Sequence, residues 1–113
     1  MKYFDFYNND DHQESIKIIM SRVYDLLCEE KFDVVDEMCV EIRENGNVHH
    51  LMAMLTMSNP FREELNERES LIDVAKIKII EEEGVSEDRA ELILKGYRKD
   101  GVSPPKVFFK RKS

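Results

Sequence analysis

Cysteine and long apolar runs are both scarce in this sequence. Its two cysteines, Cys28 and Cys39, lie in segments of helical pattern, whereas a secreted scaffold of this size would usually carry more pairs. We therefore expect two reduced, buried thiols. No apolar run approaches the roughly 18 to 20 residues of a membrane-spanning helix, and residues 1–12 lack the apolar segment of a signal peptide. The expected location is the cytoplasm, or the host cytoplasm if the chain is viral, with no membrane contact.

Histidine and glycine are too few and too scattered for most catalytic motifs. The three histidines are His12, His49 and His50, and none accompanies a recognisable nucleophile motif. The four glycines form no phosphate-binding pattern. His49 and His50 are adjacent and point about 100° apart on a helix, so they cannot easily share a metal ion, and we expect histidines on polar faces. The prediction is a non-enzyme with no catalytic residues, no cofactor and no metal.

The composition is that of one folded domain with an uneven charge. A chain of 113 residues, 42% hydrophobic and 36% charged, is long enough for a single core and too apolar to be disordered. The formal charge of −7 argues against general nucleic-acid binding. Residues 97–113 hold six cations and one acid, for +5, which leaves −12 on the rest. We expect this basic segment to fold against the acidic body, to dock on an acidic partner or to stay disordered.

Apolar residues recur at helical spacing along most of the chain. The pattern predicts helices over 13–30, 33–45, 48–57 and 86–95, and one more that ends at residue 83. Asp33, Asn47 and Ser86 are the expected N-caps. Gly46 and Gly84 are expected to end their helices in the left-handed conformation.

These elements predict an all-α fold, a bundle of four to five helices built on an N-terminal helical hairpin, with a basic C-terminal tail. The parts are an aromatic segment at 1–12, a helical domain at 13–96 and a basic, proline-containing tail at 97–113. The helix that ends at residue 83 begins either at Pro60 or near Glu67. The aromatic segment has no helical period, so it is a short strand or a segment packed across the bundle. Pairing with residues 107–109 as a two-stranded ribbon is a further alternative.

Several short motifs have a familiar order. They are EKFDVVD at 30–36, LMAMLT at 51–56, the pairs Arg62 with Leu65 and Arg68 with Leu71, and AELILKG at 90–96. The layout resembles that of small helical proteins of phages and bacteria, which are largely without an assigned function. The turn at 31–33 is also similar to the hairpin turn of tetratricopeptide-like repeats, although no second copy follows. The resemblance implies a helical adaptor and carries over no catalytic residues.

Some apolar residues fall outside the predicted core stripes. Met54 and Met57 project away from the stripe of their helix, and Ile77 and Ile80 lie on the far side of the next one. If these faces are exposed, they form a partner or dimer surface; if the N-terminal aromatics cover them, they are core. The candidate partner-binding residues are Met54, Met57, Ile77, Ile80, the acidic pair Glu63 and Glu64, and the tail residues Val107, Phe108 and Phe109.

Protein binding is the function that this pattern favours. We expect a small accessory or inhibitor protein, phage-encoded if the resemblance holds, that contacts a protein partner or a second copy of itself through the third and fourth helices. An alternative is an acidic inhibitor of a nucleic-acid enzyme, whose carboxylates at Glu63 and Glu64 mimic phosphates. A third and less favoured interpretation is nucleic-acid binding through the basic tail, which the acidic body opposes.

Overall fold

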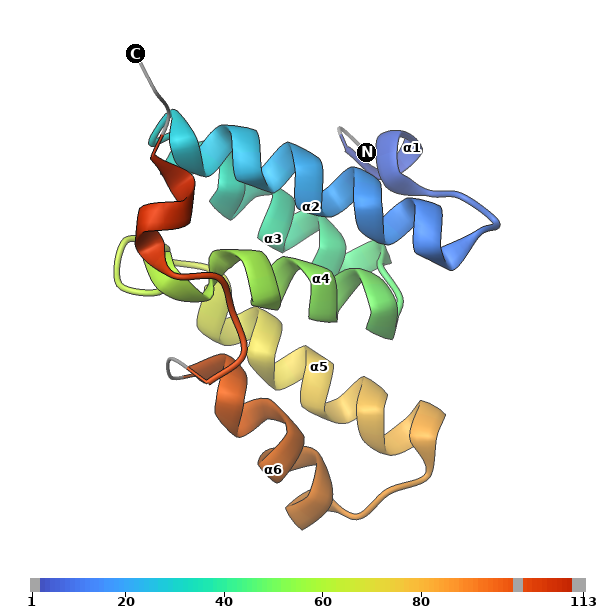
Figure 1. The fold of residues 1–113 in the computed structure, drawn as a ribbon. Coiled ribbons are helices and arrows are strands. Elements are labelled where there is room, and N and C mark those ends of the chain that lie inside the picture. Colours follow the sequence, from blue (N-terminus) through green and yellow to red (C-terminus); the bar gives the residue numbers. More distant parts are fainter. Residues whose placement is uncertain (1–2, 99–100, 111–113) are drawn as a thin grey trace.

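Helices make up most of residues 3–98 and 101–110, which are the residues that the computed structural model describes (Figure 1). The predicted all-α bundle is confirmed. The elements in chain order are α1 (Phe4–Tyr7), α2 (His12–Cys28), α3 (Phe32–Asn45), α4 (Val48–Ser58), the 3-10 helix η1 (Asn59–Phe61), α5 (Arg68–Glu83), α6 (Glu87–Arg98) and the 3-10 helix η2 (Lys106–Phe109). Within these described residues, no helix is both long and apolar enough to cross a membrane.

The predicted hairpin is formed by α2 and α3, which the structure packs together. Asp11 caps α2, its side chain accepting a hydrogen bond from the backbone N of Gln13. The turn into α3 passes through Glu30 at φ 58°, and Lys31 then occupies the N-cap position without a side-chain hydrogen bond. The prediction that Asp33 caps α3 is therefore wrong. Asp33 lies in the first turn, where its carboxylate still faces the positive end of the helix dipole.

Helix α4 is the centre of the bundle (Figure 1), and it packs against α2, α3 and α5. Met54 and Met57 are both buried. The hypothesis that these methionines form an exposed binding face is therefore wrong. A helix that is apolar on most of its circumference is covered on most sides, and here neighbouring helices bury the residues that a single core stripe leaves out.

The turn between α3 and α4 packs closely around Gly46. Gly46 has φ −81°, so the expected left-handed conformation is wrong. A side chain there would bring Cβ to 2.8 Å from the carbonyl oxygen of Ile42 and to 3.1 Å from Cβ of His50. Asn47 caps α4 as predicted: its side chain accepts from the backbone N of His50, and the ring of His50 accepts from the backbone N of Asn47. His50 is buried, contrary to the expected polar face.

Helix α5 begins at Arg68, which decides between the two predicted starts in favour of the one near Glu67. The preceding turn is fixed by Asp36 of α3, whose Oδ1 accepts from the backbone N of Asn66 at 2.9 Å and of Glu67 at 3.0 Å. Gly84 ends α5 at φ 65°, as predicted. Helix α6 starts after Ser86, whose side chain accepts from the backbone N of Arg89.

Two predictions for the ends of the chain are corrected. Helix α6 does not end at Lys95 but continues through Gly96 to Arg98. The N-terminal aromatic segment forms the helix α1, so the strand alternative is wrong; the alternative of a segment packed on the bundle is confirmed, because α1 contacts α2 and α3 and buries Tyr3 and Tyr7. The proposed ribbon with residues 107–109 is absent from the described structure, because those residues belong to η2. Four charged residues of the predicted basic tail, Lys99, Asp100, Arg111 and Lys112, lie outside the described residues.

Arg68 is the largest fully buried side chain of the core, with 1% of its surface exposed. Its Nε donates to Oγ of Ser58 at 2.9 Å, and Nη2 donates to the carbonyl oxygens of Leu55 at 3.0 Å and of Tyr97. Leu55 and Tyr97 lie in the last turns of α4 and α6. The guanidinium therefore meets the negative ends of two helix dipoles, which explains how a cation is accommodated there.

Candidate functional site

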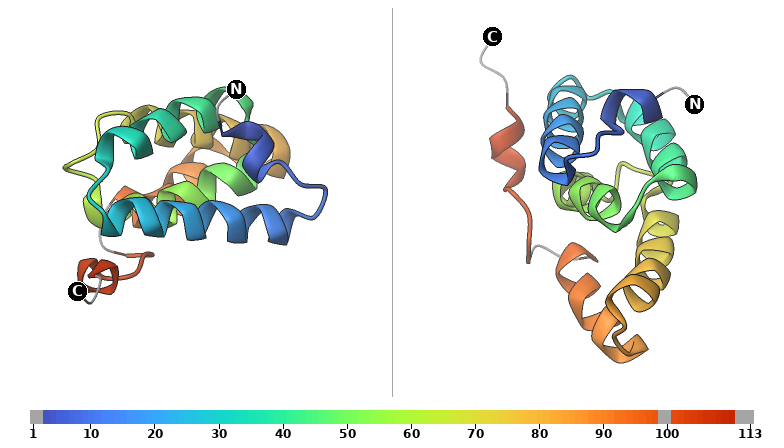
Figure 2. Two further views of the ribbon diagram at one scale, coloured as in Figure 1. Left: turned by 90° about the horizontal axis from the view of Figure 1, so that it is seen from above. Right: turned by 90° about the vertical axis from the view of Figure 1, so that its right-hand side faces the viewer.

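Residues 101–110 form a segment that we call the strap, which runs from the end of α6 back along α4 to the C-terminal half of α2 (Figures 1 and 2). It leaves α6 through a close contact of two glycines, since a Cβ on Gly101 would lie 3.1 Å from Cα of Gly96. The strap is extended at Pro105, with φ −67° and ψ 155°, and then turns into η2. Of the three alternatives for the basic tail, its described part folds against its own body.

Phe109 anchors the strap by inserting its ring between α2 and η1. The ring centroid lies 5.6 Å from that of Tyr24 and 5.1 Å from that of Phe61, the latter edge to face. Phe109 is buried, whereas Phe108 packs its edge on Tyr24 at 5.2 Å and keeps 55% of its surface exposed. One of two consecutive aromatic residues therefore holds the strap, and the other is left on the surface.

Polar contacts tie the strap to the turn after α4. Lys106 Nζ lies 2.8 Å from Glu64 Oε1 and 5.0 Å from the centroid of the Phe61 ring, a cation–π geometry. Nδ2 of the buried Asn59 donates to Oγ of Ser103 at 3.2 Å. The charge complementarity predicted between the basic tail and the acidic body is realised in the Lys106–Glu64 pair.

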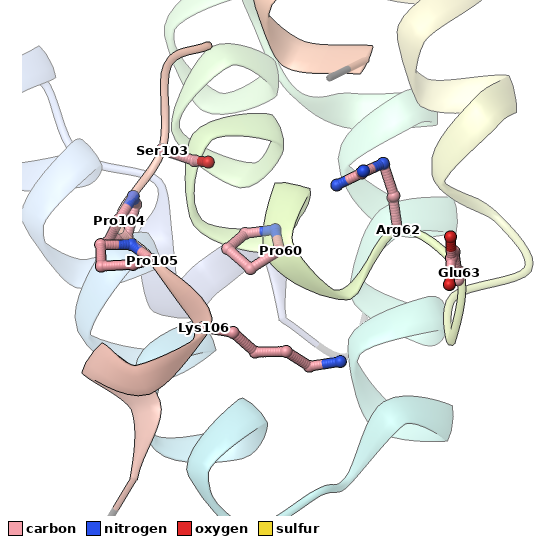
Figure 3. Close-up of a pocket in the computed structure, with 7 residues that line it drawn as sticks. All are labelled: Pro60, Arg62, Glu63, Ser103, Pro104, Pro105 and Lys106. Carbon is pink, nitrogen blue, oxygen red and sulfur yellow. The ribbon is translucent and has the colours of Figure 1, made fainter. Parts of the chain in front are cut away.

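A first cavity, of about 410 Å³, lies between the strap and the turn after η1 (Figure 3). Ser103, Pro104, Pro105 and Lys106 form one side, Arg62 and Glu63 the other, with Pro60 between them. Arg62 donates from Nη1 to the carbonyl oxygen of Asn59 at 3.1 Å, which holds its side chain over the turn. The charged lining residues are Arg62, Lys106 and Glu63, and Lys106 is already paired with Glu64.

A second cavity, the apolar hollow, has about 540 Å³ and lies between the strap and α2. It is lined by Lys17, Met20, Ser21, Tyr24, Met57, Pro104 and Phe108. Met20 and Tyr24 are four residues apart on one helix face, and Phe108 forms the opposite wall from the strap. Lys17 is the charged residue of this lining, so a cation borders an otherwise apolar space.

The structure separates the predicted partner-binding residues into three groups. The acidic pair Glu63 and Glu64 and the tail residues 107–109 meet around the strap, where Val107 is exposed and Phe109 is buried. Met57 is core but contributes to the wall of the apolar hollow, and Met54 is core only. Ile77 is exposed and Ile80 half-buried on the second half of α5, at the end of the molecule away from the strap (Figure 1).

Sequence reasoning named two residues of the apolar hollow, Met57 and Phe108, and missed the other five, which are Lys17, Met20, Ser21, Tyr24 and Pro104. By helical spacing, Met20 and Tyr24 fall on the apolar face of residues 13–30 and Lys17 on the opposite, charged face, so the pattern does not indicate that the three residues share one surface. The width of the apolar face of this helix was the signal that could have identified the hollow. When such a face is wider than the area that neighbouring helices cover, apolar residues remain at its border. The strap covers part of this border through a contact between Tyr24 and Phe109. Local sequence patterns do not encode a contact between residues so far apart in the chain.

Metal binding has no counterpart in this arrangement. Across the described ranges 3–98 and 101–110, no three histidine, cysteine or acidic side chains gather in a way that could hold an ion. Cys28 and Cys39 are free thiols, of which Cys39 is buried as predicted, whereas Cys28 is only half-buried, contrary to the prediction. Burial is the main cause that raises the pKa of the Cys39 thiol to about 12. Comparison with known proteins adds no family, because no family model, no curated protein and no solved structure matches the chain.

Proposed function

We propose that the chain is a small non-enzymatic protein that binds another protein through the strap and the adjacent face of α2. The observation that carries the proposal is the apolar hollow, in which Met20, Tyr24 and the half-exposed Phe108 surround an open space. Aromatic residues at the edge of an apolar cavity are typical anchors of protein interfaces. This surface replaces the one predicted on the third and fourth helices.

The lining of the hollow suggests the chemistry of the partner. An apolar side chain would fill the space between Tyr24 and Phe108, and Lys17 at the border would favour a carboxylate beside it. Lys110 on the strap adds a further exposed cation. A partner segment with one large apolar residue next to an acidic residue therefore fits this site. Such a contact is compatible with an accessory or inhibitory role in the cytoplasm, in a phage or a bacterium.

A pair of charge-introducing variants tests the proposal. Phe108→Asp places a carboxylate in the wall of the hollow, and Leu92→Asp makes the same change at a similarly exposed apolar residue of α6, which does not line the hollow. We expect Phe108→Asp to weaken partner capture from a lysate of the source organism on the order of tenfold or more, because interface anchors dominate affinity. Leu92→Asp should bind as the unmodified protein does.

The other outcomes identify the competing functions. Loss of binding in Ile77→Asp or Leu92→Asp but not in Phe108→Asp would place the interface on α5 and α6 and refute the proposal. A dimer in light scattering that Phe108→Asp dissociates would make the partner a second copy. Capture that nuclease treatment abolishes would favour nucleic-acid binding.

The acidic-inhibitor alternative has less support. Glu64 is engaged by Lys106 at 2.8 Å, so part of the charge that would mimic phosphates is already neutralised within the chain. Salt distinguishes the two mechanisms, because phosphate mimicry weakens steeply as ionic strength rises, whereas an apolar interface changes little.

A further inference from the structure

Histidines gather at the corner where α1, α2 and α4 meet, far along the chain from the strap. His12 from the start of α2 and His49 from the start of α4 stack with their ring centroids 4.7 Å apart. His50 lies behind them with 4% of its surface exposed. The ring of Tyr7, from α1, packs edge to face on His50 at a centroid distance of 5.1 Å. The corner thus joins the N-terminal helix to the bundle through an imidazole.

The neutral form of His50 is built into this corner. Nδ1 accepts a hydrogen bond from the backbone N of Asn47 at 3.1 Å, which requires a lone pair and places the ring proton on Nε2. Among the described residues Nε2 has no hydrogen-bond partner, and it is buried. Protonation would therefore break one half of the capping box of α4 and would place a charge in an apolar space.

The groups that face His50 do not offset such a charge. From α2 and α4, the rings of His12 and His49 face His50, and their electrostatic effect opposes a positive charge on it. From α1 comes the phenol of Tyr7, whose pKa is raised by burial and by Glu41. From α3, Glu41 already accepts from the backbone N of Tyr3 through both carboxylate oxygens at 2.7 Å. Burial is the largest cause that lowers the pKa of His50, and the electrostatic effects of His12 and His49 lower it further.

We propose that His50 is an acid-sensitive latch for residues 3–8: neutral, it caps α4 and supports Tyr7, and protonated, it releases this N-terminal segment while α2–α6 stay folded. Release is local because α1 is a single four-residue helix held by Tyr3 and Tyr7, whereas the other helices share the central core around α4. Segments with few buried contacts open at lower free energy than the whole domain. The released face of α2 and α3 would become available only in acid.

The direction of the pH effect follows from linkage. In the released state the imidazole is exposed and has an ordinary pKa of about 6.5. Because the latched state has a lower pKa, the latch is fully stable above about pH 6.5 and weakens as the pH falls below it. One proton taken up on release changes the equilibrium by up to tenfold per pH unit in that range.

Hydrogen exchange at about pH 7.5 and about pH 5.5 tests the latch, with rates corrected for intrinsic exchange. The amides of Phe6 and Tyr7, which donate to the carbonyl oxygen of Tyr3, should lose protection on the order of tenfold in acid. His50→Gln keeps an acceptor at the same capping position and cannot titrate, so its protection should not respond to pH. His12→Gln is the matched control and should retain most of the response.

The wild-type protein provides a second measurement that does not depend on a variant folding. In an NMR titration, the ring signals of Tyr7 should shift with the same midpoint as the imidazole of His50. The proposal is overturned if Tyr7 does not follow His50, if His50→Gln keeps the full pH response, or if amides of α5 and α6 lose protection together with α1. The last result would mean global acid unfolding rather than a latch.

Discussion

Replacing the buried Arg68 by methionine measures how much one guanidinium contributes to this bundle. Methionine is apolar, unbranched and of comparable length, so Arg68→Met removes the donors while filling much of the space. The variant loses the hydrogen bonds to Ser58 Oγ and to the carbonyl oxygens of Leu55 and Tyr97. Of these three acceptors, Ser58 stays satisfied in part, because its hydroxyl donates to the carbonyl oxygen of Met54 at 2.6 Å.

The magnitude is a balance of two opposing terms. Each buried carbonyl left without a partner costs about 1–3 kcal/mol. Against this, the guanidinium no longer has to be desolvated, a penalty of several kcal/mol that also lowers its pKa to about 10. Arg68 is still protonated at neutral pH, so its bonds to the two carbonyls are charge-assisted. The two carbonyls together cost about 2–6 kcal/mol, and the removed desolvation penalty offsets part of this cost. We therefore expect a net loss of about 1–2 kcal/mol, and a melting temperature lower by about 4–8 °C for a chain of this size.

Urea unfolding followed by circular dichroism is the assay, with Arg43→Met as the control. Arg43 is partly exposed and pairs with Glu67 at 3.1 Å, an interaction worth about 0–1 kcal/mol. A lower midpoint with an unchanged slope for Arg68→Met alone would agree with the expectation. If Arg68→Met is as stable as the unmodified protein, the cost of burying the charge equals the gain from its hydrogen bonds, and the expected net stabilisation by Arg68 is refuted.

Two further predictions concern small residues. Ellman's reagent should modify Cys28, which is partly exposed, more than about a hundredfold faster than Cys39, because Cys39 is fully buried and its pKa is raised; equal rates in single-cysteine variants would contradict this structure of α3. Gly46→Ala should lower the free energy of unfolding by about 1–3 kcal/mol, since its Cβ would lie 2.8 Å from the carbonyl oxygen of Ile42. Thermal denaturation checks it, and an unchanged midpoint would show that the turn can widen at no cost.

Predictions from the sequence succeeded where the determinants are local. The hairpin of α2 and α3 follows from apolar spacing, and the N-cap Asn47 and the left-handed Gly84 are single-residue signals. The start of α5 was ambiguous because its determinant, Asp36, binds the backbone from thirty residues earlier in the chain. The burial of His50 was not predictable from residue type, because it depends on Nδ1 accepting a hydrogen bond from the backbone N of Asn47 and on Tyr7 packing against the ring.

The candidate site could be predicted only in part, for a similar reason. Three large apolar residues at 107–109 indicated docking, but nothing in their pattern specifies that Phe109 is buried against Tyr24 and Phe61 while Phe108 faces outward. For Met54 and Met57, the pattern of a single helix leaves open whether they form a binding surface or part of the core. Their burial depends on α2, α3 and α5 surrounding that helix, which is a property of the assembled fold.

The strap is synthesised after the helices on which it packs. A chain is made from its N-terminus, so α2, α4 and η1 are present in the nascent protein before residue 109 is added. Until then, the rings of Tyr24 and Phe61 lack their contact with the ring of Phe109 and are more exposed to water. Exposed apolar surface of this kind promotes aggregation and chaperone binding. This apolar surface of the nascent protein is therefore covered only when the strap, the last described segment, docks on α2 and η1.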